Sequence, residues 1–419
     1  MNRSCDDTLV VIMAGGRGSR LAPLTDLRCK PALPFGGSWR TVDFVLSNCL
    51  HSGLHRIGVL TQYHAYSLIR HLSREWQPVF AGPDRGLEVW PAEQRPHADW
   101  YCGTANAVYQ NLDIVRRYRP RRVLVLAADH VYRMDYRELI EAHERSGASV
   151  TVGCIEVPRS ESRHFGVMVT DGTGRIVKFA EKPANPLGMT TPDGNVLASM
   201  GIYLFDADTL LATLERDAGR CDSGHDFGGD IVPDLIANAR TPVCAHAFGD
   251  GAEETPYWRD IGTLDSYWRA HMDLVQPDSA LDIHDPDWPI LGGNGALPPP
   301  RLMSDPRTGQ PAVIFNSLVA GGCRLDGMLA RDSVLFPNVS VGAGSVLERC
   351  VVLPGARIGR GCRLSDTIVD EDCELPDGTV IGQDRARDAR YCEMSEHGVA
   401  VVSSSTADGL QPRRVSSMS

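Results

Sequence analysis

The sequence predicts an α/β fold in which a mixed, mostly parallel sheet is followed by a parallel β-helix of hexapeptide repeats. Two observations support this prediction. From residue 8 to about 275, short apolar, β-branched runs alternate with helix-like stretches, a pattern typical of a mostly parallel sheet covered on both faces. After residue 312, apolar residues instead recur every five or six positions. That period matches neither a helix nor an ordinary strand and is characteristic of β-helix coils.

The alternating region begins with the apolar run LVVIMA at residues 9–14, which predicts a buried strand. Later runs of the same kind end in polar or small residues. Because ligands of such sheets bind beyond the carboxyl ends of the strands, these residues are candidates for a site. We expect strands over 9–14, 56–62, 122–129, 149–157 and 201–208, and helices over 103–119 and 136–147.

The six-residue period is carried by apolar positions separated by steps of five or six residues. Small residues follow several of them, as in Val341-Gly342, where a tight corner of the chain would require them. A β-sandwich with chance spacing is the alternative, but an unbroken run of such steps disfavours it. The positions are Leu329, Leu335, Val341, Leu347, Leu353, Ile358, Leu364, Val369, Leu375 and Ile381.

These patterns divide the chain into four parts. We expect a catalytic domain over residues 1–284, a linker rich in Pro and Gly over 285–311, the β-helix over 312–395, and a polar C-terminal tail over 396–419.

Composition excludes several classes of protein. A net charge of −11 argues against a general nucleic-acid binder. The twelve cysteines are scattered without a CxxC pair, which indicates reduced thiols rather than disulfides or a zinc site. There is neither a signal-peptide pattern nor a run of roughly 20 apolar residues. We therefore expect a soluble, cytoplasmic protein that associates with neither nucleic acid nor membranes.

The first strand ends in MAGGRGSRL, residues 13–21. This is not a Walker-type loop, and it fails the dinucleotide pattern GxGxxG because Leu21 stands where a glycine is needed. Gly15, Gly16 and Gly18 would let backbone N–H groups reach phosphate oxygens, and Arg17 and Lys30 would neutralise their charge. A glycine-rich turn with solvated arginines is the alternative reading of this segment alone.

Further motifs give this segment its context. GGRGSRL followed by KPALPFGG resembles the sugar-nucleotide pyrophosphorylase family. TQYH, PAEQR, DWYCGTANAV, LAADHVY, HFGVM, FAEKPANP, ASMGIYLFD, HDFGGDIVP and YWRDIGT follow in the order of that family, and the likeness runs from about residue 8 to 395. The set most resembles the bacterial branch that forms ADP-glucose.

The resemblance implies a Rossmann-like nucleotidyltransferase domain, a left-handed β-helix and a homotetramer. It also implies that ATP and α-D-glucose 1-phosphate react to give ADP-glucose and diphosphate for glycogen synthesis, with Mg²⁺ as cofactor and small phosphorylated effectors. The attacking phosphate oxygen is already anionic at neutral pH. Catalysis should therefore depend on positioning and on cations that spread the developing charge.

Two aspartates are the candidate metal ligands. Asp129 ends the strand RVLVLAAD, and Asp260 lies in YWRDIGT. A pair of carboxylates together with substrate phosphates commonly holds Mg²⁺, and the matching aspartates of the family have this role. As alternatives, Asp129 would cap a helix and Asp260 would belong to a turn. Asp129, Lys30 and Arg17 form the expected catalytic set.

Other roles are implied by the resemblance. Glu181 would accept hydrogen bonds from sugar hydroxyls and Lys182 would pair with the sugar phosphate, although a surface EKP turn is the alternative. Tyr101, Gly166 and Ser199 would complete the glucose 1-phosphate site. Gln94 would bind adenine, and Gln62 and Trp100 would couple the regulatory and substrate sites, with a packing role as the alternative for each of these three.

Several positions depart from the enteric-type pattern. Near the substrates, Cys102 stands for arginine, Asn106 for aspartate, Ala128 for glycine and Gly229 for lysine. The loss of the arginine and the lysine should weaken the binding of anions. Among the expected regulatory residues, Arg28, Arg40 and Arg117 are present, whereas Leu27 replaces lysine, Pro34 histidine and Glu371 arginine. An acidic side chain at position 371 would repel a phosphate group. We therefore expect this protein to bind a different effector or to bind its effector weakly.

Three functions other than ADP-glucose synthesis are alternatives for this sequence. An acyltransferase is disfavoured, because such β-helix enzymes use a histidine and none lies between His284 and His397. A catalytically impaired regulatory subunit of the same fold, or a pyrophosphorylase for another sugar nucleotide, stays open.

Overall fold

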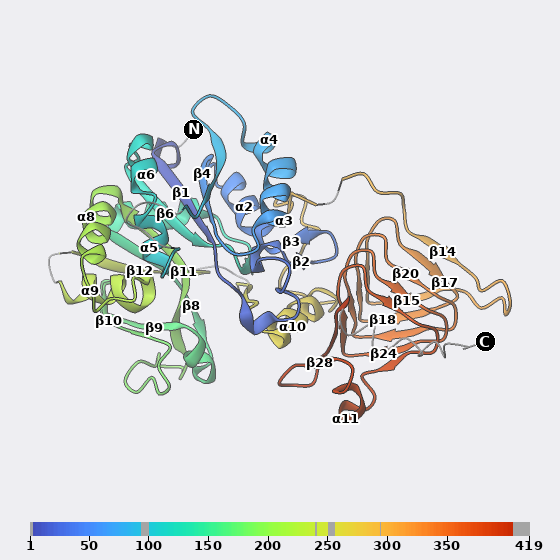
Figure 1. Cartoon of the computed structure of the whole chain (residues 1–419). Coiled ribbons are helices and arrows are strands. Elements are labelled where there is room, and N and C mark those ends of the chain that lie inside the picture. The colour runs from blue at the N-terminus through green and yellow to red at the C-terminus, as the bar shows by residue number, and fades with distance from the viewer. Residues whose placement is uncertain (1–2, 94–99, 239–240, 250–255, 294, 405–419) are drawn as a thin grey trace, which may run out of the picture. The chain divides into compact units, whose positions relative to one another are not determined.

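The computed structural model describes residues 3–93, 100–238, 241–249, 256–293 and 295–404. The chain forms two compact units, each assembled from separate segments (Figure 1). The first comprises Met1–Gly16, Val45–Ala128 and Tyr132–Pro256. The second comprises Arg17–Phe44, Asp129–Val131 and Tyr257–Ser419. Within the described residues, no helix is long and apolar enough to cross a membrane.

The first unit contains a nine-stranded mixed sheet with the central order β10-β9-β11-β6-β1-β4-β5. Strands β6, β1, β4 and β5 run parallel, and β11 pairs antiparallel with β6, β8 and β9. The mixed sheet predicted from the sequence is confirmed. The strands are β1 Thr8–Ala14, β4 Arg56–Thr61, β5 Gly86–Pro91, β6 Arg122–Ala127, β8 Val150–Val157, β9 Gly166–Thr170, β10 Ile176–Glu181, β11 Val196–Asp206 and β12 Val243–Ala247.

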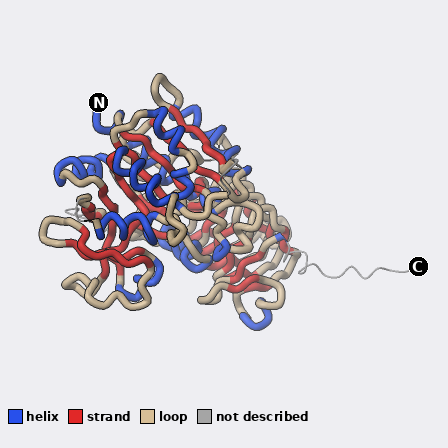
Figure 2. The backbone as a smooth tube through the Cα atoms, turned by 60° about the vertical axis from the view of Figure 1, so that its left-hand side comes forward, coloured by secondary structure: helices blue, strands red, loops and turns tan. Residues whose placement is uncertain are grey.

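Helices lie beside this sheet, as Figure 2 shows in blue. In α7, Tyr136–Ser146, buried side chains recur every three or four residues, so one face packs on the core. Asp135 caps its N-terminus and Gly147 ends it in a left-handed conformation. Others are α3 Tyr66–His71, α5 Thr104–Tyr109, α6 Leu112–Tyr118, α8 Ala207–Ala218 and α9 Val232–Ala237.

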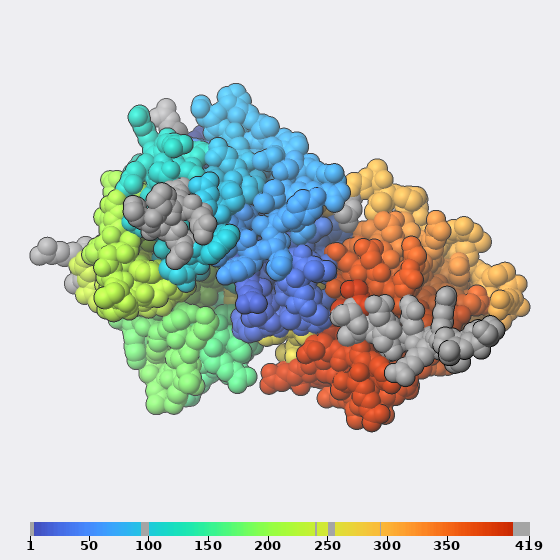
Figure 3. Space-filling view, viewed as in Figure 1, coloured from blue at the N-terminus to red at the C-terminus, as the bar shows by residue number. Residues whose placement is uncertain are grey.

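The second unit contains the β-helix, drawn in orange to red in Figure 3. Its strands form three parallel ladders, β14-β17-β20-β23-β26, β15-β18-β21-β24-β27 and β16-β19-β22-β25-β29, and β28 adds antiparallel to the last. Successive coils align apolar residues such as Val341, Ile358 and Leu375, all buried. The parallel β-helix predicted from the six-residue period is confirmed.

The coils are short strands joined by corners. The first ladder has β14 Arg301–Met303, β17 Arg324–Asp326, β20 Ser340–Val341, β23 Arg357–Ile358 and β26 Glu374–Leu375. The second has β15 Val313–Phe315, β18 Leu329–Arg331, β21 Val346–Glu348, β24 Arg363–Ser365 and β27 Val380–Ile381. The third has β16 Leu318–Val319, β19 Val334–Leu335, β22 Val351–Val352, β25 Thr367–Val369, β28 Glu393–Met394 and β29 Ala400–Val402.

The observed coils differ from the sequence expectation in two details. Leu329 is only half-buried, and its neighbour Ala330 occupies the inward position opposite Leu347. The paired strands also extend beyond 312–395. β14 lies within the expected linker and pairs with β17, while β29 lies within the expected tail and pairs with β25.

Residues 17–44 and helix α10, Leu264–Leu274, pack against the β-helix within the second unit. Tyr267 Oη donates a hydrogen bond to Pro34 O at 2.5 Å, and Trp268 Nε1 donates to Arg349 O at 2.9 Å. His271, fully buried, accepts from Gly36 N at 3.3 Å. A single hydrophobic cluster runs through all three segments. The segment that carries Lys30 is therefore built on the same core as the β-helix.

Candidate active site

Three candidate catalytic residues meet in the second unit. Lys30 begins the short 3-10 helix η2, Lys30–Ala32, and is 7% exposed. Asp129 follows β6 in sequence, and Asp260 ends β13, Trp258–Asp260, which pairs with β7, His130–Tyr132. The Lys30 ammonium lies 2.6 Å from Asp129 Oδ2 and 3.0 Å from Asp260 Oδ1. One lysine thus bridges both predicted metal ligands.

This bridge favours the charged forms of Lys30 and Asp129. Burial alone would raise the pKa of Asp129, but the charges of Lys30 and His130 hold it well below its usual range. Burial would likewise lower the pKa of Lys30, yet the two carboxylates raise it above its usual value. The side chains of Asp129 and Asp260 are more exposed than that of Lys30. The Asp129 carboxylate is therefore ionised, and both carboxylates are partly exposed.

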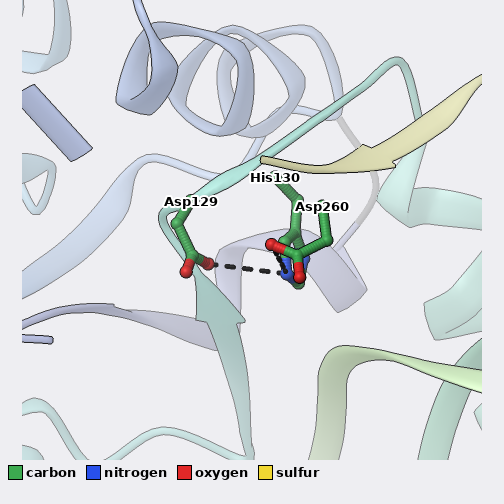
Figure 4. A group of neighbouring side chains, drawn as sticks. All are labelled: Asp129, His130 and Asp260. Carbon is green, nitrogen blue, oxygen red and sulfur yellow. Dashed lines mark ion pairs between the residues drawn. The ribbon is translucent and has the colours of Figure 1, made fainter. Parts of the chain in front are cut away.

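His130 completes the group, as Figure 4 shows. Its Nε2 lies 3.5 Å from Asp129 Oδ1 and 3.8 Å from Asp260 Oδ1. Its ring packs edge-to-face on Trp258, with centroids 5.0 Å apart. Its Nδ1 is buried without a hydrogen-bond partner among the described residues. His130 was not singled out in the sequence, although LAADHVY contains it.

Asp129, His130 and Asp260 can together hold a metal ion, because one ligand atom from each lies within 4.8 Å of the others. The donor chemistry fits a divalent cation: two carboxylates supply hard oxygen ligands and leave positions for water and phosphate. The Lys30 ammonium now pairs with the oxygens that such a cation would use. A cation held there would compete with Lys30 for the same carboxylates.

The glycine-rich segment is divided between the units. In the second, Gly18 has φ +65° and precedes η1, Ser19–Leu21, and a Cβ there would lie 3.2 Å from Thr25 Cγ2. Arg17 is exposed. In the first, a Cβ on Gly15 would lie 3.3 Å from Gln62 Cβ, whereas Gly16 is exposed with open space around it.

A second group of predicted residues lies in the first unit around Glu181, the last residue of β10. Its carboxylate lies 2.8 Å from the Lys182 ammonium. A Cβ on Gly166 would lie 2.4 Å from Phe179 Cζ and 2.8 Å from Glu181 Oε2, and a Cβ on Gly228 would lie 2.6 Å from that same oxygen. Two glycines therefore leave the space that the Glu181 carboxylate fills. Gly228 was not predicted, although it lies in the quoted motif HDFGGDIVP.

Tyr101 and Ser199 also lie in the first unit. Tyr101 Oη accepts a hydrogen bond from Asn111 Nδ2 at 2.9 Å, and its carbonyl accepts one from Gln62 Nε2 at 3.5 Å. Ser199 is buried in β11 where the pairing register with β8 shifts, and its hydroxyl accepts from Gly201 N. Asn111 is a further residue that the sequence did not reveal.

The remaining predicted site residues lie neither in the group around Lys30 nor in the group around Glu181. Trp100 and Arg117 are exposed, and Arg117 lies 3.8 Å from Asp113. Arg40 donates to Ala32 O at 2.7 Å. Gln94 lies outside the described residues. Arg28 is buried and paired with Asp370 and Glu371.

Comparison with known proteins agrees with both units. The nucleotidyl transferase family model matches residues 9–277, and a GlmU-like C-terminal hexapeptide model matches residues 298–402, consistent with a left-handed β-helix. The chain is 48% identical to glucose-1-phosphate adenylyltransferase 2 of Alkalilimnicola ehrlichii, over 96% of this chain and 94% of that protein.

Other relatives carry the same name. The glucose-1-phosphate adenylyltransferase of Pectobacterium carotovorum subsp. carotovorum is 45% identical over 96% of each chain. That of Thiobacillus denitrificans is 47% identical over 94% of this chain and 90% of that protein. The chain belongs to the nucleotidyl transferase family and, within it, to the glucose-1-phosphate adenylyltransferases.

Proposed function

We propose that this protein transfers the adenylyl group of ATP to α-D-glucose 1-phosphate, giving ADP-glucose and diphosphate. The observation that carries the proposal is the family membership, which extends over nearly the whole chain. Lys30, Asp129 and Asp260 are present and in mutual contact, which disfavours a catalytically impaired regulatory subunit. The product would supply the synthesis of glycogen.

Asp129 and Asp260 would hold Mg²⁺, with His130 beside them. When bound, the cation would neutralise phosphate charge and stabilise the leaving diphosphate. The Lys30 ammonium would leave the carboxylates and pair with a phosphate oxygen of ATP. Backbone N–H groups of the Gly15–Gly18 segment and the Arg17 guanidinium would bind the remaining phosphate charge.

In the sugar site, Glu181 would accept hydrogen bonds from sugar hydroxyls, and Lys182 would pair with the phosphate of glucose 1-phosphate. The close approach of the Glu181 carboxylate to Gly166 and Gly228, which have no side chain to block it, supports this role. Tyr101 and Ser199 would complete the sugar site. Gln94 would bind adenine. Since the phosphate nucleophile is anionic at neutral pH, these residues orient it and no general base is needed.

We further propose a cytoplasmic homotetramer that does not bind nucleic acid and responds weakly to small phosphorylated effectors. Arg28, an expected effector-binding cation, is paired with two carboxylates, while Arg40 and Arg117 would remain for an anion. Leu27 is fully accessible on the surface and offers no charge. Activation by fructose 1,6-bisphosphate should be much smaller than in the enteric enzymes, and equal activation would contradict this part.

The function is tested by measuring diphosphate release from purified protein with Mg²⁺, glucose 1-phosphate and ATP, UTP, dTTP or GTP. We expect turnover with ATP, and loss of it in Asp129→Ala. Equal or faster turnover with another nucleotide would indicate a different sugar-nucleotide synthase. No turnover with any nucleotide would favour the regulatory-subunit alternative.

A further inference from the structure

Arg28 is a buried cation with two carboxylates beside it, although its Nη1 makes no hydrogen bond within the described residues. Its side chain is 8% exposed, and its Nε donates to Leu24 O at 2.8 Å. Nη2 pairs with Asp370, and Nη1 lies 2.7 Å from Glu371 Oε2. Burial alone would lower the pKa of Arg28, but the two carboxylates raise it above its ordinary value. The guanidinium is thus permanently charged and held by three groups.

The two carboxylates belong to a fixed corner of the β-helix. Asp370 follows β25, and its N–H donates to Val402 O at 2.8 Å. Asp370 Oδ1 also accepts a hydrogen bond from Glu371 N at 2.8 Å. Because this corner is tied to the neighbouring strand β29, it provides a rigid anchor for the arginine.

On the other side, Arg28 is separated from Lys30 by one buried residue, Cys29. Lys30 O in turn accepts hydrogen bonds from Leu33 N and Thr41 Oγ1, each at 3.1 Å. Because only Cys29 lies between them, a displacement of Arg28 would act on Lys30 through the backbone, against the two hydrogen bonds that the Lys30 carbonyl accepts. The chain here carries two buried cations, one paired with the β-helix and the other with the candidate metal ligands.

We propose that Asp370 and Glu371 are positioning residues for Lys30, acting through Arg28. The proposal rests on the proposed function, in which the Lys30 side chain leaves Asp129 and Asp260 and pairs with substrate phosphate. A side chain that exchanges partners needs a backbone that stays in place, and the Arg28 contacts supply that anchor. The corner 370–371 of the β-helix is therefore part of the catalytic apparatus of this protein.

Burying this ion pair costs desolvation free energy, which a contact that only stabilised the fold would not require. Two acidic groups surround one arginine, and Asp370 is largely buried, so removing Arg28 leaves a buried charge unpaired. Glu371 is the better site for a test, because its side chain is 32% exposed and its replacement leaves the Arg28–Asp370 pair intact. Glu371→Gln keeps the shape of the side chain and removes its charge.

The test compares Glu371→Gln and Glu371→Asp with a control, Glu374→Gln. Glu374, in the next strand β26 of a different ladder, pairs with Arg357 at 2.6 Å on the exposed surface. In Glu371→Gln we expect kcat to fall on the order of 10-fold with both KM values nearly unchanged, as for a displaced catalytic group. Glu371→Asp should recover most of the activity, and Glu374→Gln should match the wild type.

A second readout needs no turnover. A loosened Lys30 competes less well for Asp129 and Asp260, so Glu371→Gln should bind Mn²⁺ alone several-fold more tightly than the wild type. If Mn²⁺ affinity and kcat both equal the wild-type values, or if Glu374→Gln changes them equally, the positioning role is overturned. An inactive wild type would instead refute the proposed function, while the Mn²⁺ comparison would still decide the positioning role.

Discussion

Lys30 pairs with both candidate metal ligands, so replacing it should strengthen metal binding to the free protein while abolishing efficient turnover. The Lys30 ammonium lies 2.6 Å from Asp129 Oδ2 and 3.0 Å from Asp260 Oδ1, so a divalent cation bound by these two oxygens would have to displace it. Each contact is a charge-assisted hydrogen bond, which contributes about 1.5 kcal/mol or more. Two of them amount to about 3 kcal/mol, or roughly 100-fold in affinity.

The substitution is Lys30→Met, which keeps an unbranched side chain only one heavy atom shorter and removes the charge. Mn²⁺ binding without nucleotide, followed by electron paramagnetic resonance, should show affinity about 100-fold higher than in the wild type. Lys182→Met is the matched control, because it also removes an ammonium that pairs with a carboxylate, at 2.8 Å from Glu181. Unchanged or weaker Mn²⁺ binding in Lys30→Met would refute the competition between lysine and metal.

Three further outcomes are expected. Gly166→Ala places a methyl group 2.4 Å from Phe179 and 2.8 Å from Glu181, so KM for glucose 1-phosphate should rise at least 10-fold, whereas Gly172→Ala, in open space, should not change it. Burial lowers the pKa of His271 to about 4, so only the unfolded state takes up a proton on this ring between pH 7 and 4.5. The wild type should therefore lose about 2 to 3 kcal/mol of stability over this range, measured by urea unfolding, and His271→Gln should lose less. Ellman's reagent should label two thiols quickly in the native protein, those of the exposed Cys102 and Cys221, and the ten buried thiols only after unfolding. More than two fast thiols would contradict the burial of the others. An equal loss of stability at low pH in His271→Gln and in the wild type would contradict the role of His271.

Much of the fold follows from local sequence patterns. The run LVVIMA predicted a strand at 9–14, and the structure has Thr8–Ala14. The six-residue period worked because every face of a β-helix coil must supply an inward apolar side chain. It wrongly predicted that Leu329 rather than Ala330 points inward. Both residues are apolar, and which of them faces the core depends on the register with the next coil. Such register is a long-range property that spacing alone does not determine.

The candidate active site was harder to predict from the sequence than the fold. Asp129 and Asp260 could be identified because each lies in a quoted family motif, but the bridge by Lys30 joins residues that are 99 and 230 positions apart. Arg28 was expected, by resemblance, to meet an effector phosphate. Glu371 in place of a basic residue indicated a changed charge in this region, but not that it pairs with Arg28. Such pairings arise from tertiary packing.

The central claim is that the chain transfers the adenylyl group rather than a phosphoryl group. The direct measurement incubates the protein with Mg²⁺, glucose 1-phosphate and ATP labelled with ³²P at either the α or the γ position, beside Asp129→Asn. We expect the α label in ADP-glucose and the γ label in diphosphate, with both products lost in the variant. Label from the γ position in a sugar phosphate, or no labelled sugar nucleotide from the wild type, would contradict the proposed function.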